Sequence, residues 1–409
     1  MAFDLLIQRA RLAGGDGVPV DIGVAGGLIV ALAPGLPASG EVIDADGRVV
    51  SPGLIETHIH LDKSRIVDRC APASGRARDH MKRVAAVKPG FTVEDVYARA
   101  RATLEGCLLH GTTHMRTHVE VDPNVGLVGF EALRELARDY RWGIDLELCV
   151  FAQEGLTDTP EADRNMVAAL RDGATVVGGA PGYDPDRPGQ IRRIFELARE
   201  FDVDVDIHLD VGPTAEELDV LLVCELADAM GWGGRVTVGH GTKYSCLPPD
   251  ELARLGRRLA DSGVAVTVLP ATDLFITGRH LDHDVVRGVA DANALRACGV
   301  RCSLSTNNVL NPFTPFGDCS LVRVANLYAH TVQRGNDDEL AECFEMLTRQ
   351  SAAILRREDY GIAVGHPADL VLWDARTSAE VVATNAIALA GFKRGRRTFT
   401  RERAVLHRP

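Results

Sequence analysis

The sequence predicts an α/β protein built around a (β/α)8 barrel of the TIM type, with a small discontinuous β-sandwich formed by both ends of the chain. From residue 54 onward, short apolar strands alternate with helical segments, which is typical of parallel β/α units. Residues 3–50 have instead the pattern of short strands separated by glycine turns, and residues 361–405 also have the pattern of strands. No G-x-G-x-x-G follows the first strand of the alternating region, which favours a barrel over an open dinucleotide-binding sheet.

These patterns divide the chain into three parts. We expect residues 1–52 and 359–409 to form the two halves of the sandwich and residues 53–358 to form the barrel. Thr92 and Thr214 have the character of helix N-caps, because acidic residues follow each of them within the first turn. The predicted barrel strands are 54–60, 111–117, 143–151, 174–179, 203–208, 235–240, 264–269 and 300–305, and the predicted helices are 92–109, 126–139, 161–171, 188–200, 214–230, 249–262 and 284–297.

The composition excludes several classes of function. A net charge of −12 over 409 residues argues against nucleic acid or an anionic membrane as a partner, since both require a basic face. The chain has no apolar run of about 18 residues and no secretory pattern at its N-terminus. Its nine cysteines form no C-x-x-C pair, so we expect reduced thiols. The expected location is the cytoplasm.

Histidines end several of the predicted strands. His58 and His60 lie two residues apart, so they share one strand face with Glu56, while His208 and His240 end the fifth and sixth strands. In a barrel these strand ends surround one mouth. Imidazole is the commonest neutral metal ligand in proteins. The pattern therefore predicts a metal site, with chance placement of polar histidines as the alternative.

Longer motifs connect these histidines to a known family. The chain resembles the metal-dependent amidohydrolase superfamily, in the cytosine deaminase branch that includes s-triazine aminohydrolases. The resemblance implies one divalent metal ion, Zn or Fe, a small-molecule substrate and a homo-oligomer. It is carried by Pro52-Gly-Leu-Ile-Glu-Thr-His58-Ile-His60-Leu-Asp62-Lys63-Ser64, Arg116-Thr-His118, Phe151-Ala-Gln153, Val205-Asp-Ile-His208, Val236-Thr-Val-Gly-His240, Asn307-Asn308 and Ala368-Asp-Leu-Val371.

The resemblance also implies roles for individual residues. His58, His60 and His208 match the histidine ligands of the metal. His240 matches the residue that touches the attacking water and stabilises developing charge, and Gln153 matches the glutamine that reads the ring amide of the substrate.

Two positions depart from the family pattern. Asn307 replaces the aspartate that ends the eighth strand; an amide offers a neutral oxygen ligand but is not a base. Val211 replaces a glutamate that moves protons in cytosine deaminases. Asp210 shares the strand parity of His208, so we predict that it is the general acid/base, with a capping aspartate as the alternative.

The remaining expectations concern the substrate. Lys63 could orient an anionic or carbonyl-rich substrate or pair with Asp62, and Asn308, Phe313 and Phe316 are expected to line the pocket. The function that these observations favour is a metal-dependent hydrolase that cleaves a C–N bond, by deamination or dealkylamination, in a small N-heterocycle such as a pyrimidine or s-triazine. One alternative is a hydrolase that opens the ring of a cyclic amide or ureide. The other is a catalytically silent ligand-binding protein, because the usual aspartate and glutamate are replaced.

Overall fold

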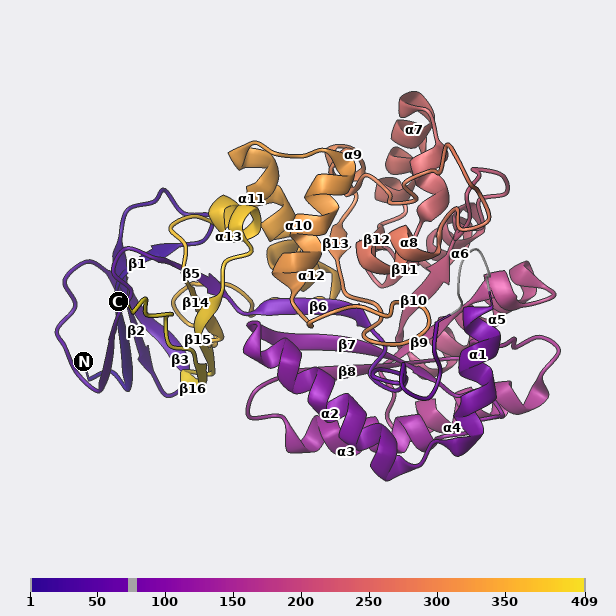
Figure 1. Ribbon diagram of the computed structural model, residues 1–409, viewed down its shortest axis with the longest axis horizontal. Helices are drawn as coiled ribbons and strands as arrows, with labels where there is room; N and C mark the ends of the chain where they lie inside the picture. The colour runs from indigo at the N-terminus through magenta and orange to yellow at the C-terminus, as the bar shows by residue number, and fades with distance from the viewer. Residues whose placement is uncertain (1, 73–78, 408–409) are drawn as a thin grey trace.

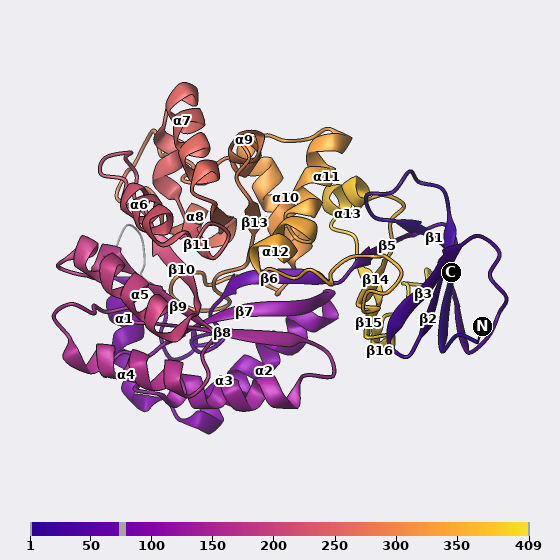
Figure 2. The same cartoon turned by 180° about the vertical axis from the view of Figure 1, so that it is seen from behind.

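The structure is a computed structural model that describes residues 2–72 and 79–407. It consists of a barrel surrounded by helices and a smaller β-domain beside it, in which both chain termini lie (Figure 1). The view from behind shows the same two parts side by side (Figure 2). The predicted barrel with a discontinuous β-domain is therefore confirmed.

Eight parallel strands form the barrel, and neighbours in the sequence are neighbours in the sheet. A parallel bridge between Ile59 and Asn307 joins the first strand to the end of the last. The carboxyl ends of all eight strands therefore face one mouth. The strands are β6 (Leu54–Ile59), β7 (Thr112–Glu120), β8 (Asp145–Phe151), β9 (Val176–Gly179), β10 (Asp204–Leu209), β11 (Val236–His240), β12 (Val264–Val268) and β13 (Cys302–Leu304).

Helices pack around the barrel, and most of their buried apolar side chains join one large core, with smaller clusters around Val84 and Ala352. The Thr92 side chain accepts a hydrogen bond from the Asp95 amide, so its predicted role as N-cap is confirmed. The helices are α1 (His80–Val87), α2 (Val93–Leu109), α3 (Val128–Asp139), α4 (Pro160–Arg171), α5 (Arg187–Phe201), α6 (Val220–Met230), α7 (Pro249–Asp261), α8 (Pro270–Ile276), α9 (Ala292–Ala297), α10 (Leu321–Val332), α11 (Asp337–Glu345), α12 (Arg349–Ile354) and α13 (Ser378–Thr384), with short 3-10 turns η1 (Lys88–Gly90), η2 (Pro181–Tyr183) and η3 (Thr242–Cys246).

Two predicted helices start later than expected. The helix predicted over 214–230 begins at Val220, so Thr214 is not an N-cap. The helix predicted over 284–297 begins at Ala292, where the Asp291 side chain caps it. In the first case the preceding residues form a loop that borders the cavity described below.

The small domain takes strands from both ends of the chain. Residues Leu5 to Ile7 of β1 pair with β2, whereas Arg11 and Leu12 pair with β5, and the register shifts between these two parts. The first part of β1 therefore pairs with β2 and its end with β5, which joins the strands from both ends of the chain in one path. The strands are β1 (Leu5–Leu12), β2 (Val20–Ala25), β3 (Leu28–Ala33), β4 (Glu41–Asp44), β5 (Val49–Pro52), β14 (Leu370–Trp373), β15 (Ala388–Lys393) and β16 (Arg396–Thr400).

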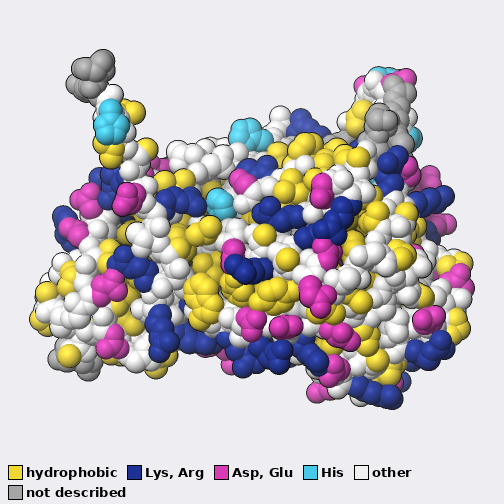
Figure 3. Space-filling view, turned by 60° about the horizontal axis from the view of Figure 1, so that its bottom comes forward, with side chains coloured by type: hydrophobic (Ala, Val, Ile, Leu, Met, Phe, Trp, Pro, Cys, Tyr) yellow, Lys and Arg dark blue, Asp and Glu magenta, His cyan; other side chains and the backbone are white. Residues whose placement is uncertain are grey.

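The distribution of surface charge and the state of the cysteines are those expected from the composition. On the face drawn in Figure 3, Lys and Arg side chains are interspersed with Asp and Glu side chains. All nine cysteines are free thiols, as the sequence predicts. Among the helices formed by residues 2–72 and 79–407, none is both long and apolar enough to span a lipid bilayer.

Candidate metal-dependent active site

Three histidines converge at the mouth of the barrel. The Nε2 atom of His208, on β10, lies 3.0 Å from Nε2 of His58, on β6, and 3.0 Å from Nε2 of His60, just beyond β6. His58 and His60 are buried, and His208 is half-buried at the wall of the cavity. Two nitrogens that each bind one ion at about 2.0–2.1 Å would lie about 3.0–3.4 Å apart. The three histidines therefore have the spacing of ligands to a single divalent cation.

Burial keeps these histidines neutral. It lowers the pKa of His58 to about 3, and it lowers the pKa values of His60 and His208 well below their usual range. The His208 Nδ1–H donates to the Gly179 carbonyl at 3.1 Å, which leaves the Nε2 lone pair directed at the other two histidines. A neutral imidazole with a free lone pair is the form that binds a metal.

Asn307 adds an oxygen to this group. Its backbone amide donates to the His58 carbonyl at 2.9 Å, and its carbonyl accepts from the His60 amide at 2.8 Å, so the residue is fixed against the first strand. Its Oδ1 atom is buried and has no hydrogen-bond partner among the described residues, and Asn307 lines the cavity. An unpaired buried amide oxygen beside three neutral imidazoles fits a place in the coordination shell of a cation.

His118 also approaches these histidines, but from the side. Its ring stacks on His58 with centroids 3.7 Å apart, and its Nε2 lies 3.4 Å from Oδ1 of Asp206. The atoms of His58, His118 and His208 are close enough to form a metal-binding group. His60 directs Nε2 at His208, whereas His118 directs Nε2 at the buried Asp206.

A second cluster, formed by His114, Asp145 and Asp369, also has metal-ligand spacing. The Lys393 ammonium lies within it, 2.8 Å from Asp145 and 2.7 Å from Asp369. The cluster is therefore an ion-pair network between the barrel and the small domain rather than a metal site.

His240 ends β11 and borders the same cavity. Its Nδ1 lies 2.6 Å from Oδ1 of the fully buried Asp273, which belongs to the short helix α8. A carboxylate only accepts, so Nδ1 carries the proton and Nε2 is available as a base. The sequence predicts His240 but not Asp273, because no spacing links Asp273 to the strand-end histidines.

Asp210 lies at the cavity but is tied to the backbone. Its carboxylate oxygens accept from the amides of Asp219 and Val220, at 2.8 and 3.2 Å, and from the Tyr244 hydroxyl at 3.0 Å. The first two donors are the free amides at the start of α6. These are the contacts of a capping aspartate, which was the alternative role, and they occupy both oxygens.

The cavity wall contains most of the predicted substrate-binding residues. Lys63, Gln153, Asn308 and Phe313 line a cavity of about 230 Å³, below the range of about 300–1,000 Å³ typical of drug-sized ligands. Phe316 does not join them, so this prediction is wrong: the side chain is exposed and contacts Phe275 edge-on.

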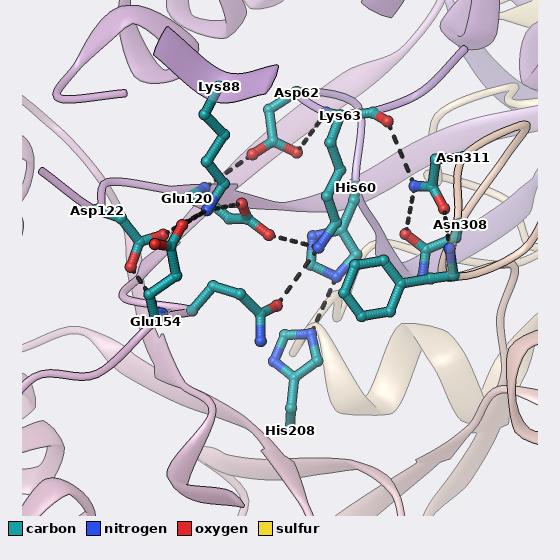
Figure 4. A network of polar contacts seen from close by, with 12 residues as sticks. His60, Asp62, Lys63, Lys88, Glu120, Asp122, Glu154, His208, Asn308 and Asn311 are labelled. Carbon is teal, nitrogen blue, oxygen red and sulfur yellow. Dashed lines mark hydrogen bonds and ion pairs between the residues drawn. The ribbon is translucent and has the colours of Figure 1, made fainter. Parts of the chain in front are cut away.

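Lys63 belongs to a buried network of alternating charges (Figure 4). Its ammonium lies 2.5 Å from Glu120 instead of pairing with the Asp62 carboxylate, and Glu120 also contacts Lys88 at 2.6 Å. Lys88 is buried as well, and three carboxylates raise its pKa above the usual range although burial alone would lower it. The network continues from Lys88 to Asp122 and Glu154.

Strand alternation predicts that Glu56 shares a face with His58 and His60, but its carboxylate does not join the histidine rings. Its carboxylate accepts hydrogen bonds from the backbone amides of His58 and Thr306. The register between β6 and β7 shifts between Glu56 and Ile59, so strict alternation does not hold there. Burial raises the pKa of Glu56 to about 7.

Comparisons with known proteins place this chain in a family. Residues 41–144 and 129–399 match the amidohydrolase family. The chain is 28% identical over 406 residues to N-isopropylammelide isopropyl amidohydrolase of Pseudomonas sp., covering 96% of each chain. It is 29% identical over 366 residues to pterin deaminase of Rhizobium rhizogenes, covering 88% of this chain and 83% of the relative.

A solved structure shows the same architecture. The crystal structure of 5-methylcytosine deaminase from Klebsiella pneumoniae, liganded with 5-fluorocytosine, superposes with a TM-score of 0.93 at 28% identity and covers 99% of each chain. With the histidine cluster at the mouth of a matching barrel, the chain belongs to the amidohydrolase family and is a metal-dependent hydrolase of non-peptide carbon–nitrogen bonds.

Proposed function

We propose that this enzyme removes ammonia or an alkylamine from a small N-heterocycle such as a pyrimidine or s-triazine, with one zinc or iron(II) ion. The observation that carries the proposal is the meeting of three neutral imidazoles and the Asn307 oxygen beside the His240–Asp273 pair. The small volume of the cavity favours a substrate of one ring. The names of the relatives support the class: ammelide, pterin and 5-methylcytosine are N-heterocycles.

Each residue of the site has a place in this reaction. The ion would be held by His58, His60, His208 and Asn307, and when bound it would lower the pKa of a water at its open position. His240 accepts a proton from the attacking water at Nε2 as the oxygen–carbon bond forms. It then gives that proton to the leaving nitrogen as the carbon–nitrogen bond breaks.

We assign this proton transfer to His240 rather than to Asp210. Asp273 holds Nδ1–H of His240 and so keeps Nε2 free to accept, as a buried aspartate does in hydrolytic triads. Both oxygens of Asp210 already accept from the start of α6 and from Tyr244. His240 also replaces the bases that are absent at Asn307 and Val211.

A product screen tests the proposal. The metal-loaded enzyme is incubated with amino- and alkylamino-substituted pyrimidines and triazines, and with hydantoins and barbiturates, while ammonia, amine and product mass are measured. Release of ammonia or amine from at least one aminated ring is expected, and a His240→Ala variant should lose it. A product that has gained water but released neither ammonia nor amine would indicate the second candidate function, ring opening. Ring opening is compatible with Val211 in place of the proton-carrying glutamate, because the leaving nitrogen is then part of the ring.

A further inference from the structure

A buried charged pair lies inside the barrel, farther from the mouth than the histidine cluster. Asp206 precedes His208 by two residues on β10, and Arg116 precedes His118 by two residues on β7. Alternation along each strand therefore places each charged residue on the same face as its histidine. The Arg116 guanidinium lies 3.1 Å from Oδ2 of Asp206, and both side chains are buried. Apolar side chains are the usual filling of a barrel of this type, so a charged pair here calls for a reason.

The pair continues to the surface through Glu147. Its Oε2 atom lies 3.1 Å from the Arg116 guanidinium, and 31% of its side chain is exposed. Glu147, Arg116 and Asp206 thus form a charge chain, with Glu147 at its solvated end and Asp206 at its buried end. Two carboxylates and one guanidinium leave this charge chain with one net negative charge. A carboxylate is therefore kept at a depth where an isolated one would be strongly disfavoured.

One oxygen of Asp206 has no partner. Arg116 contacts Oδ2, whereas Oδ1 is buried and accepts no hydrogen bond from residues 2–72 and 79–407. Oδ1 lies 3.4 Å from Nε2 of His118 and 3.7 Å from Nδ1 of His58. These two nitrogens also lack a hydrogen-bond partner in the described chain. A buried acceptor and two buried ring nitrogens thus lie together, which is rare unless the site has a further use for them.

The tautomer of His58 connects this oxygen to the metal site. Its Nε2 lies 3.0 Å from Nε2 of His208, so a neutral ring that binds the ion through Nε2 carries its proton on Nδ1. The carboxylate within 4 Å of Nδ1 is that of Asp206. Gly239 leaves room for the ring in this place, since a Cβ at residue 239 would lie 2.9 Å from Cε1 and 3.0 Å from Nδ1 of His58. The ring therefore has one nitrogen toward the other ligands and one toward Asp206.

We infer that Asp206 is a positioning residue of the metal site, which accepts the Nδ1 proton of His58 and supplies the negative charge that the four proposed ligands lack. This inference rests on the metal ion of the proposed function. A carboxylate that accepts from a metal-binding imidazole fixes the ring and makes its other nitrogen a stronger ligand. The buried charge also attracts a divalent cation, and Arg116 offsets little of this attraction because Glu147 offsets Arg116.

Metal retention tests this role. The zinc-loaded wild type, Asp206→Asn and Glu147→Gln are each mixed with a chelator, and the half-life of bound zinc is followed by the absorbance of the zinc–chelator complex. Asp206→Asn keeps the shape of the side chain but removes its charge, so the half-life should shorten by ~10–100-fold. Glu147→Gln is the matched control, because it removes the same charge from the solvated end of the charge chain and should change the half-life by less than ~3-fold. A half-life of Asp206→Asn within ~3-fold of the wild type, or equal losses in the two variants, would overturn the inference.

An Arg116→Met variant separates charge from structure. It breaks the same buried pair as Asp206→Asn but keeps the carboxylate. Zinc should therefore raise the Tm of Arg116→Met at least as much as that of the wild type, and should raise the Tm of Asp206→Asn less. Equal losses of the zinc-induced rise in both variants would show a structural pair and refute the role of Asp206. If Asp206→Asn does not fold by circular dichroism, the Arg116→Met result decides, and a smaller rise than in the wild type would overturn the inference.

The inference and the proposed function fail in different ways. A wild type that retains no zinc after loading would reject the proposed function and this inference with it. Equal retention by the wild type and Asp206→Asn, with amine released in the product screen, would reject only the role of Asp206. Shortened retention in Asp206→Asn with a failed product screen would support that role and reject the proposed reaction.

Discussion

At the scale of single residues, burial determines which chemistry the histidines can perform. Burial and the neighbouring positive charges lower the pKa values of His58, His60 and His208, which favours their neutral form. Asn307 would continue this pattern, since it would contribute an oxygen without a charge. The proposed set of four ligands is therefore neutral.

Replacing Asn307 with Asp tests this neutral set. A carboxylate would add a negative charge at the cation, so the metal should be retained more firmly, and its half-life against a chelator should increase at least ~10-fold. The half-life is followed by the absorbance of a metal–chelator complex. Asn336→Asp, which adds the same charge at the start of α11, should leave it unchanged. An equal half-life in the Asn307 variant would place this side chain outside the coordination shell.

Replacing Asp273 with Asn tests the orientation of His240. The amide can donate to Nδ1 and so favour the wrong tautomer, with the proton on Nε2. The turnover number should fall by ~10²–10⁴-fold while the Michaelis constant changes little. Steady-state kinetics measure both, with Asp261→Asn on the exposed end of α7 as the control. A loss of less than ~10-fold would remove the pair from the mechanism.

The sequence predicts the ligand histidines because strand ends in a barrel share one mouth. It does not predict Asp273, since that residue lies on a short helix after β12 and meets His240 only in space. The orientation of Asn308 also depends on tertiary contacts, through Asn311. Strand alternation does not predict the contacts of Glu56, because the pairing of β6 with β7 shifts register between Glu56 and Ile59.

At the scale of elements, the segment between β10 and α6 shows how Asp210 fixes the start of a helix beside the candidate active site. Residues 214–218 have a helical sequence pattern, yet the helix begins at Val220 because Asp210 binds the amides of Asp219 and Val220. Local propensity predicted the helix but not its first turn, which a long-range contact decides.

An Asp210→Asn variant separates capping from catalysis. One amide oxygen cannot serve three donors, so we expect the free energy of unfolding to fall by about 1–2 kcal/mol. Turnover should remain within ~10-fold of the wild type. Denaturant melts and steady-state kinetics measure the two effects. A loss of turnover of ~10²-fold or more, with an intact fold, would instead make Asp210 the proton carrier.

At the scale of the whole molecule, a buried lysine joins the small domain to the barrel. Lys393 ends β15 and contacts Asp369, the carbonyl of Thr113 and the carboxylate of Asp145 at the start of β8. Burial alone would raise the pKa of Asp145, but the hydrogen bond to His114 and the Lys393 charge hold it well below the usual range. Lys393 opens the basic run Lys393-Arg394-Gly395-Arg396-Arg397, a pattern typical of a solvated turn, and only the packing of the two domains reveals its burial.

A Lys393→Met variant should lower the free energy of unfolding by about 3–5 kcal/mol, because two carboxylates lose their buried partner. Lys82→Met, at an exposed position of α1, should change it little. A depressed carboxyl pKa gives stability that is present above the unfolded value and is lost as the pH falls. The wild type should therefore lose stability below about pH 4, and the Lys393 variant less steeply. Parallel acid profiles of the two proteins would contradict this role.

The presence of a metal ion at the histidine cluster is tested most directly by elemental analysis of the protein purified without chelator. We expect about one equivalent of Zn or Fe per chain, which a His208→Ala variant loses. Less than about one-tenth of an equivalent in the wild type, with no uptake after Zn, Fe, Mn or Co is added, would contradict a metal-dependent hydrolase at this site.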